Sequence, residues 1–258
     1  MKNWVAVCLV MASVVYGDDQ QVVEKAPPKL EAQPSDFYVY DPAMNIRPYV
    51  GIVGGIAPLA GTYKAKEISV ASGMKDFASL GGTPGLIGGV YGIQMKYWRR
   101  GFFAVQVNTL SNTLHRVVSS SKNSSGIVNA KASIKNYFQW GADLRFGGKT
   151  GSTNHYIFTG FESGKWGLEL RNDSSDYNQG ISPNSSITTH QTLWGGKFGA
   201  GITFPLHKRE IVWVNMEYSY TWFGHVNNTL TNPNNGNTWT HRANVQQNSV
   251  LFGMNYLF

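Results

Sequence analysis

The sequence predicts an all-β protein folded as an eight-stranded antiparallel up-and-down transmembrane β-barrel. Three observations carry this prediction. From Arg47 onward, apolar and polar residues alternate with the two-residue period of a strand, and the helical period is absent. The connections between the candidate strands are alternately short and long. The chain stops on "VLFGMNYLF", which has the pattern of a strand interior rather than of a solvated tail.

Residues 1–17, "MKNWVAVCLVMASVVYG", have the features of a secretory signal peptide. Lys2 precedes an apolar core from Trp4 to Val15, and a small residue, Gly17, marks the expected cleavage point. The apolar core is too short to act as a membrane anchor. Residues 18–46 are rich in Gln, Glu and Pro, which predicts a flexible periplasmic linker. The barrel is then expected to occupy residues 47–258.

The composition excludes several classes of protein. The only cysteine, Cys8, lies in the signal peptide, so we expect no disulfide, iron–sulfur cluster, thiol catalysis or cysteine-based zinc site in the mature chain. Subtracting Lys2 from the formal charge of +7 leaves +6. The basic residues are scattered, which argues against nucleic acid as a partner. After residue 17 there is no 18-residue apolar run, so a soluble β-protein and a β-barrel remain.

The candidate strands divide the chain into eight segments: 47–58, 86–98, 101–117, 134–147, 154–171, 190–206, 211–226 and 242–258. The connections after the second, fourth and sixth are short. Those at 59–85, 118–133, 172–189 and 227–241 are long and rich in Ser, Asn, Thr and Gly. Short periplasmic turns and long extracellular loops are typical of outer-membrane barrels. An even number of strands places both termini in the periplasm.

Most candidate strands have one apolar face and one mixed face. In "IVWVNMEYSYTWFGH" the apolar face runs from Val212 to Trp222 and ends in aromatic residues, which favour membrane–water interfaces. The opposite faces carry glycines and single charges, as a narrow lumen requires. We therefore expect the apolar faces to contact lipid. A soluble sandwich with these faces as its core is the alternative.

The charged residues on the mixed faces are predicted to form a lumen charge network: Lys96, Asp143, Arg145, Lys197 and Glu217. A tight turn after the sixth strand would bring Lys197 within salt-bridge reach of Glu217. Other charges expected to point inward are Lys165, Glu169 and Arg171. Because buried charges need partners, the network is expected to neutralise itself and plug the lumen. The functional alternative is the gate of a narrow pore.

The segment 154–171 fits the pattern badly. Tyr156, Phe158 and Trp166 share the parity of Glu162, so an apolar lipid face would put this carboxylate into the membrane. A β-bulge near Ser163 would shift the register and remove the conflict. The alternative is that "ESGKWG" forms a tight turn.

The last strand is predicted to pair with the first, near Tyr49 to Ile56, with its odd residues facing the lumen and its even residues facing lipid. On these features residues 47–258 resemble the small eight-stranded outer-membrane β-barrels of Gram-negative bacteria. This group includes the transmembrane domain of outer-membrane protein A, the outer-membrane protein X type and the opacity proteins. The resemblance implies a location in the cell outer membrane. It also implies that the outer-membrane assembly machinery reads the C-terminal signal, here Phe252, Met254, Tyr256 and Phe258.

The residues that could carry chemistry show no catalytic or metal-binding pattern. The spacing of the histidines fits no metal site, and no Ser–His pairing stands out from chance: His115, His155, His190, His207, His225 and His241. We therefore expect no enzymatic activity, no cofactor and no metal. Several cations on the loop side have the chemistry to contact lipid A phosphates, and ordinary solvated charge is the alternative: Lys64, Lys66, Arg116, Lys122, Lys131, Lys135 and Arg242.

The predicted function is that of a surface protein with a structural or adhesion role, acting through its four long extracellular loops. Its expected partners are outer-membrane lipid and lipopolysaccharide, the assembly machinery, and a host or cell-surface ligand. A narrow porin-like channel for small solutes is the alternative, and a lipid A-modifying enzyme is the third hypothesis.

Overall fold

The computed structural model describes residues 46–68, 75–96, 101–112, 117–122, 128–206 and 211–258. The predicted signal peptide and residues 18–45 of the predicted linker lie outside these ranges, as do His115 and His207. Among the described residues no helix is long and apolar enough to cross a membrane. The described strands are β1 (Ile46–Ile56), β2 (Leu59–Glu67), β3 (Lys75–Gly82), β4 (Gly85–Lys96), β5 (Gly101–Asn112), β6 (Val117–Lys122), β7 (Val128–Thr150), β8 (Thr153–Asn172), β9 (Ser185–Pro205), β10 (Val212–Thr231) and β11 (Thr238–Leu257).

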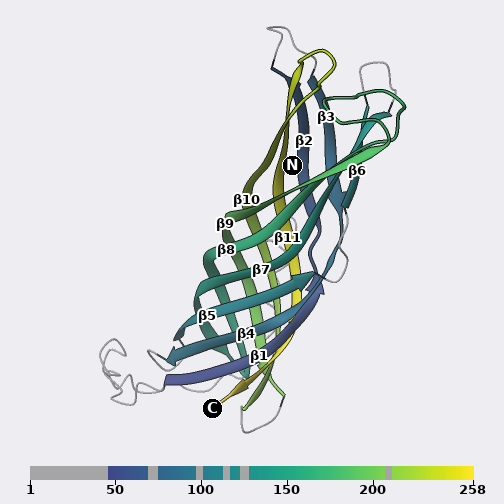
Figure 1. The fold of residues 1–258 in the computed structure, drawn as a ribbon. Coiled ribbons are helices and arrows are strands. Elements are labelled where there is room, and N and C mark those ends of the chain that lie inside the picture. The colour runs from purple at the N-terminus through teal and green to yellow at the C-terminus, as the bar shows by residue number, and fades with distance from the viewer. Residues whose placement is uncertain (1–45, 69–74, 97–100, 113–116, 123–127, 207–210) are drawn as a thin grey trace, which may run out of the picture. The chain divides into compact units, whose positions relative to one another are not determined.

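The strands close into an antiparallel ring of eight, as the sequence predicts (Figure 1). The ring runs β1–β4–β5–β7–β8–β9–β10–β11 and returns to β1. At the seam β1 pairs with β11 from Tyr49↔Leu257 to Ile56↔Val250, and Phe258 N–H donates to the carbonyl of Pro48 at 3.0 Å. The last strand is therefore paired on both sides and leaves no open edge.

Three of the four predicted long loops are wrong in extent, because much of 59–85, 118–133 and 227–241 is strand, whereas 172–189 does contain a long loop, residues 173–184. Within 59–85, β2 continues the line of β1 after Ala57 and Pro58, and β3 runs into β4 across Thr83 and Pro84. A proline has no N–H for the ladder, so the strands break there without changing direction. In 118–133 and 227–241, β6, β7, β10 and β11 also continue. Outward residues of the described extensions are largely polar, such as Lys64 and Lys66 on β2 and Asn227 and Thr229 on β10, which gave the sequence a loop-like composition.

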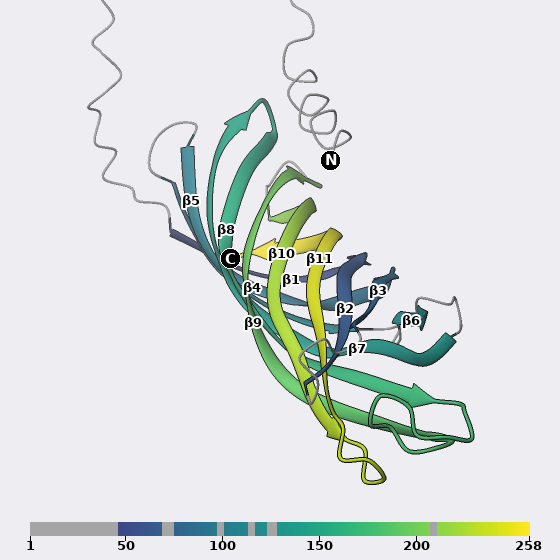
Figure 2. The same cartoon turned by 90° about the horizontal axis from the view of Figure 1, so that it is seen from above.

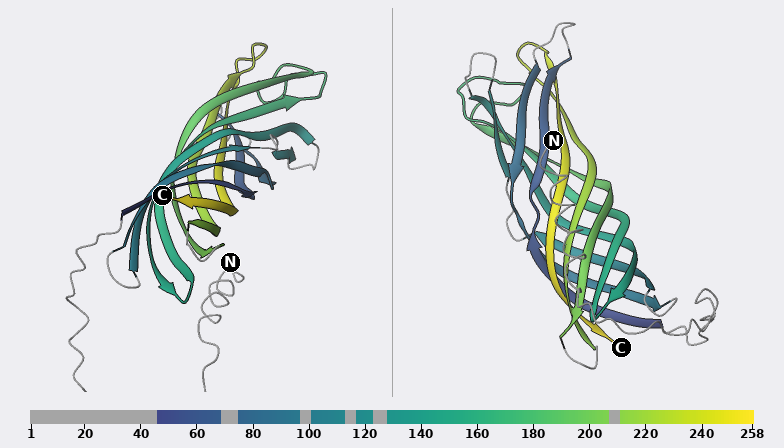
Figure 3. Two further views of the ribbon diagram at one scale, coloured as in Figure 1. Left: turned by 90° about the horizontal axis from the view of Figure 1, so that it is seen from below. Right: turned by 180° about the vertical axis from the view of Figure 1, so that it is seen from behind.

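The exterior of the lower barrel, at the end with the short turns, is a belt of exposed apolar side chains. It includes Ile52, Ile157, Phe198 and Phe252, each more than half exposed. A barrel surface of this kind is stable only in lipid. The five strands β7 to β11 have 20 to 23 residues each, whereas about 9–11 suffice to cross a bilayer. The strands therefore continue well beyond the belt, on the side of the long hairpins (Figure 3).

Beyond the belt the ring divides into two facing sheets, called the head below (the described residues of 59–82, 117–136, 166–193 and 223–245). Pairing between β9 and β10 ends at Gly195↔Phe223, although both strands continue. Among the described residues β3 and β6 share the single pair Phe77↔Lys122. One sheet is thus β6–β7–β8–β9 and the other is β3–β2–β11–β10 (Figure 2).

The two sheets of the head enclose an apolar core. Its fully buried members come from both sheets: Tyr63, Ala65, Ala132, Ile134, Trp166, Leu168, Leu170, Phe223, Val226, Ala243 and Val245. Inward side chains of the head are therefore apolar and outward ones polar, which is the reverse of the lower barrel. This reversal positions the polar network in the lower barrel and an apolar plug above it.

The reversal also explains the misfit of β8. Tyr156, Phe158 and Trp166 face the lumen together with Glu162, and all four are buried. The predicted bulge and the alternative turn near Ser163 are both wrong, because β8 pairs with β9 without a break from residue 154 to residue 172. The register shift lies instead on the neighbouring strand β7, between Asn136 and Phe138. In the head the inward residues of β7 are even-numbered, such as Ile134 and Asn136. Below the register shift they are odd-numbered, such as Gln139 and Asp143.

Candidate functional site

A bidentate ion pair between β7 and β10 lies at the centre of the lumen network. Arg145 Nη1 lies 2.7 Å from Glu217 Oε1, and Arg145 Nη2 lies 3.0 Å from Oε2. The Tyr156 hydroxyl and the Asn215 amide donate to the same Oε1 at 2.9 and 3.0 Å. All four side chains are buried. Parallel hydrogen bonds of this kind are among the strongest polar contacts that side chains form.

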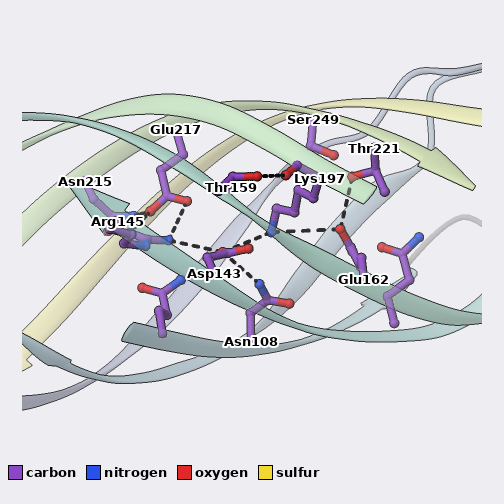
Figure 4. A network of polar contacts seen from close by, with 12 residues as sticks. Asn108, Asp143, Arg145, Thr159, Glu162, Lys197, Asn215, Glu217, Thr221 and Ser249 are labelled. Atoms are coloured by element: carbon purple, nitrogen blue, oxygen red, sulfur yellow. Dashed lines mark hydrogen bonds and ion pairs between the residues drawn. The ribbon is translucent and has the colours of Figure 1, made fainter. Parts of the chain in front are cut away.

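A second group of charges surrounds Lys197. Its Nζ lies 3.2 Å from Asp143 Oδ2 and 3.8 Å from Glu162 Oε2 (Figure 4). The Thr221 hydroxyl donates to Glu162 Oε2 at 3.1 Å. Arg145 Nη2 lies 3.6 Å from Asp143 Oδ2, so the two groups form one connected network.

The network has more carboxylates than cations. Among the described residues it holds two cations, Arg145 and Lys197, against Asp143, Glu162 and Glu217. The ring of Phe158 lies 5.2 Å from the guanidinium carbon of Arg145 and 5.6 Å from Lys197 Nζ, which stabilises both cations. Glu162 Oε1 and Asp143 Oδ1 are buried without a hydrogen-bond partner. The ion pair of Glu162 with Lys197 is the longest in the network, so Glu162 is the least satisfied carboxylate.

The structure brings Asp143, Arg145, Lys197 and Glu217 together, but not with the predicted partners. The predicted pair of Lys197 with Glu217 is wrong. Lys197 lies opposite Thr221, four residues beyond Glu217 on β10, and Glu217 pairs with Arg145 instead. The fifth predicted member, Lys96, ends β4, and its side chain lies outside the described part of the chain.

Glu162 is the member that sequence reasoning missed, because β8 was assigned the opposite faces. For the same reason Lys165, Glu169 and Arg171 do not point into the lumen as predicted. Lys165 and Arg171 are exposed, and Glu169 forms a 2.8 Å ion pair with Lys135 on the outside of the head. The even spacing of Glu162 with Tyr156 and Phe158 was the available signal, since a carboxylate that faces lipid is costly and therefore favours the lumen for the whole face.

Above the charges a layer of amides separates the network from the head core. Gln139 Nε2 donates to Gln247 Oε1 at 2.7 Å, and Gln247 donates to the Ser249 hydroxyl at 3.0 Å. Below the charges, a cavity of about 40 Å³ is lined by Tyr49, Arg145 and other lumen residues. A space of this size holds about one or two water molecules. Side chains therefore fill the described lumen from the amide layer through the head core.

The loop between β8 and β9, residues 173–184, folds into the head. Its Ile181 is fully buried in the apolar core. Residues Gln179 and Gly180 both have positive φ, 51° and 80°, and form a two-residue turn between Asn178 and Ile181. A Cβ at Gly180 would lie 2.8 Å from the Cβ of Leu230, so glycine is required there for close packing as well as for conformation.

His241 holds this turn to the opposite sheet. Its Nε2 lies 3.0 Å from the carbonyl oxygen of Gln179, and its Nδ1 lies 2.7 Å from the hydroxyl of Tyr63. A carbonyl only accepts, so Nε2 carries the proton and Nδ1 accepts from Tyr63. Burial lowers the pKa of His241 to about 4, and the bond to Gln179 partly opposes this shift.

The four residues of the predicted assembly signal lie on the outer face of the last strand. Phe252, Met254, Tyr256 and Phe258 are all about half exposed or more. The rings of Tyr256 and Phe258 lie 5.1 Å apart. They form an apolar row along the seam, at the end of the barrel that carries the short turns.

Within the described ranges, no group of three or more His, Cys, Asp or Glu side chains could hold a metal ion. His155 and His190 are exposed, and His225 accepts from Arg242 Nη2 at 3.0 Å. None of the four described histidines forms a hydrogen bond with a serine in this part of the chain.

Comparisons with solved structures identify the architecture. The outer-membrane protein OprG of Pseudomonas aeruginosa matches with a TM-score of 0.51 and 16% identity, over 81% of this chain and 95% of that chain. The chain has the fold of the small outer-membrane β-barrels. In outer-membrane barrels of this fold the short turns are periplasmic and the long hairpins are extracellular.

Two further structures are similar at lower scores. Neisserial surface protein A matches with a TM-score of 0.39 and 15% identity, over 82% of this chain and 97% of that one. The outer-membrane protease OmpT of Escherichia coli matches with a TM-score of 0.41 and 11% identity, over 81% and 97%. No protein-family model matches the sequence, and no curated protein matches it.

Proposed function

We propose that this β-barrel is a non-enzymatic surface protein. In this proposal the barrel anchors the head in the outer membrane, and the head contacts a host or cell-surface ligand. The observation that carries the proposal is the contrast between a filled lumen and an ordered head outside the membrane. Channels need a continuous aqueous path, whereas adhesive proteins need a stable surface held away from the bilayer.

The filling of the lumen argues against the alternative of a narrow channel. An ion crossing the barrel would have to displace the Arg145–Glu217 pair, the Gln139–Gln247 amide layer and then an apolar core. Buried ion pairs and dry cores both resist such opening, since each broken contact leaves a buried group without a partner.

The packing of the head supports a role in contact with other surfaces. Its core includes the fully buried Trp166, and the loop 173–184 is ordered by bonds from Asn172 to the carbonyls of Asp176 and Ile181, at 2.8 and 3.1 Å. A preordered surface loses little conformational entropy on binding. The described turn 232–237 and the exposed residues 173–176 offer polar groups for such contacts.

Conductance across planar bilayers tests the closed lumen. We expect no defined conductance steps for the refolded wild-type barrel. Glu217→Ala removes the central carboxylate, and conductance steps that appear only in this variant would show that the network is what closes the lumen. Steady conductance in the wild type would favour the channel and contradict the proposal.

Whole-cell adhesion tests the role of the head. Cells displaying the protein are measured on immobilised host matrix, with residues 232–237 and the exposed residues 173–176 replaced by Gly and Ser. A matched control replaces Gly151 and Ser152, the turn at the opposite end. Adhesion should fall in the head variants and persist in the control. Equal adhesion of cells that lack the protein would overturn the assignment.

A further inference from the structure

A groove lies on the outer wall of the barrel, at the upper edge of the apolar belt. Its walls are Phe198, Tyr220 and Trp222, and its floor is the backbone of β8 and β9 at Gly160 and Gly196. Phe198 and Trp222 are 58% and 65% exposed, so these rings stand out from the wall on either side of the glycines. The groove has a volume of about 460 Å³ and opens outward, into the region that lipid chains occupy.

The floor of the groove is open above Gly196. A Cβ built on this glycine meets no atom within 4 Å. Gly196 lies directly opposite Trp222, whose large ring forms one wall. Gly196 thus leaves a slot between the protruding rings of Phe198 and Trp222, and a hydrocarbon chain lying there would bury apolar surface on both sides.

Cations stand above this groove on the same outer face. Trp222 pairs with Gln246, and Arg242 lies four residues farther along β11, or about 13 Å away at the usual rise of a strand. Arg242 lies directly opposite Lys64, and both side chains are exposed. The guanidinium of Arg242 and the ammonium of Lys64 therefore lie side by side on the outer face, above the groove.

The guanidinium of Arg242 is held in position by uncharged partners. Its Nε donates to Asn244 Oδ1 at 3.3 Å, and its Nη2 donates to His225 Nδ1 at 3.0 Å. Among the described residues no carboxylate forms an ion pair with it. Its charge is thus fixed in direction and still available to an anion from outside the chain. Arginine is well suited to bind a phosphate with two parallel hydrogen bonds.

We propose that the groove and these cations together bind one phosphorylated glycolipid of the outer leaflet, a lipid A. One acyl chain lies over Gly196 between Phe198 and Trp222, and a phosphate group contacts Arg242 and Lys64. The order of the parts along the wall matches the order in a lipid, since the apolar slot lies within the belt and the cations lie on the extracellular side. The proposal depends on the membrane position of the barrel and is independent of any adhesive role.

Native mass spectrometry of the mature protein, refolded in detergent without lipopolysaccharide, tests this site. The probes are bisphosphorylated hexa-acyl lipid A, the same lipid without its phosphates, and phosphatidylglycerol. The site variants are Gly196→Leu, which fills the slot, and the double variant Arg242→Gln with Lys64→Gln. The matched control for the slot is Gly81→Leu. Gly81 is exposed, and a Cβ built on it would meet no atom within 4 Å. It pairs with Ala60, which in turn pairs with Gln246 at the edge of the groove. Lys165→Gln, which removes an exposed cation elsewhere on the outer wall, is the control for charge.

The wild type should bind a single phosphorylated lipid A at least about tenfold more tightly than either other lipid. Both site variants should lose at least about tenfold of that affinity, while both controls should stay within about threefold. Heat-modifiable migration shows that each variant is folded. If Gly196→Leu fails to fold, the exposed charge variant decides alone. Equal binding of the dephosphorylated lipid, unchanged binding by the charge variant, or an equal loss in Gly81→Leu would each overturn the proposal.

Discussion

Arg145 and Glu217 form a bidentate ion pair across the lumen, from strands β7 and β10, which are not neighbours in the ring. Glu217→Gln would leave the Arg145 guanidinium buried without its main counter-charge. Breaking a buried pair by neutralising one member costs about 3–5 kcal/mol. We expect the urea midpoint of the barrel in lipid vesicles to fall accordingly, at an unchanged urea dependence. A loss below about 1 kcal/mol would mean that Asp143 takes over the role of Glu217.

Glu162→Gln should behave in the opposite way, although Glu162 is equally buried. This substitution removes the carboxylate that exceeds the two cations and keeps an oxygen to accept from Thr221. The expected change in unfolding free energy is within about 1 kcal/mol, or a small gain. The same urea titration in vesicles measures it beside Glu217→Gln. A loss as large as that of Glu217→Gln would show that Lys197 depends on Glu162 as its counter-charge.

The closed ring and the orientation of the last strand were predictable from the sequence. In the lower barrel the period-two alternation and the lipid face coincide, and Val250 to Phe258 show the same two faces in the sequence and in the structure. Membrane thickness favours such a pattern, because the outward residues of a strand are mostly apolar over the about 9–11 positions that cross the bilayer.

The same rule could not predict which residues of the head face inward, nor which charged side chains pair with each other in the lumen. Outward residues in the head face water, so the alternation inverts, and Trp166 and Leu168 become core residues rather than lipid contacts. A reading of apolar faces as lipid faces therefore misassigned β8 and Glu162. The Arg145–Glu217 pair crosses the ring between strands that share no hydrogen bonds, and pairwise register arguments reach only adjacent strands.

Gly180→Ala should loosen the loop 173–184. Gly180 has φ of 80°, and an added Cβ would lie 2.8 Å from the Cβ of Leu230. Strain of about 1–2 kcal/mol then adds to overpacking of about 1–3 kcal/mol. Hydrogen exchange of the Ile181 amide, which donates to the carbonyl of Asn178 at 2.8 Å, should become faster. Gly236→Ala is the control, because its φ is 73° but its added Cβ meets nothing within 4 Å, so it carries the strain alone. If each substitution raised the exchange rates of the amides around its own site by the same factor, packing against Leu230 would contribute nothing.

His241 should make the stability of the head depend on pH. Its pKa is near 6.5 when the head is unfolded and about 4 when it is folded, so the unfolded state binds more protons between these values. The stability is fully present above about pH 6.5 and falls as the pH drops toward 4, by up to about 3 kcal/mol. Hydrogen exchange of the head at pH 7 and pH 4.5, corrected for intrinsic rates, measures this loss.

Two variants separate the role of His241 from general acid effects. His241→Phe removes the titrating group, and the difference between the two pH values should shrink by most of its wild-type size even if the variant is less stable throughout. His190→Phe changes an exposed histidine and should leave the difference unchanged. An undiminished pH effect in His241→Phe would assign the titration to the carboxylates of the head.

Substitutions of Leu257, the last residue of β11, and of Phe258, which follows it, separate an effect on assembly from an effect on stability. Phe258 is 68% exposed and is joined to the barrel by its backbone bond to Pro48 and a ring contact with Tyr256. Leu257 points inward and is buried with Tyr49 and Trp213. Phe258→Ala should therefore change the unfolding free energy in vesicles by less than about 1 kcal/mol, and Leu257→Ala should cost about 2–4 kcal/mol.

If the outer face of the last strand is read during assembly, the cellular outcome is reversed. Phe258→Ala should lower the amount of folded protein in the outer membrane more than Leu257→Ala does, in spite of its smaller effect on stability. Heat-modifiable migration of membrane fractions measures the folded amount, and refolding of the same variants into vesicles serves as the reference. If Phe258→Ala impaired refolding into vesicles as much as insertion in cells, the aromatic end would be acting through packing at the seam, and the assembly signal would have to be sought elsewhere on the strand.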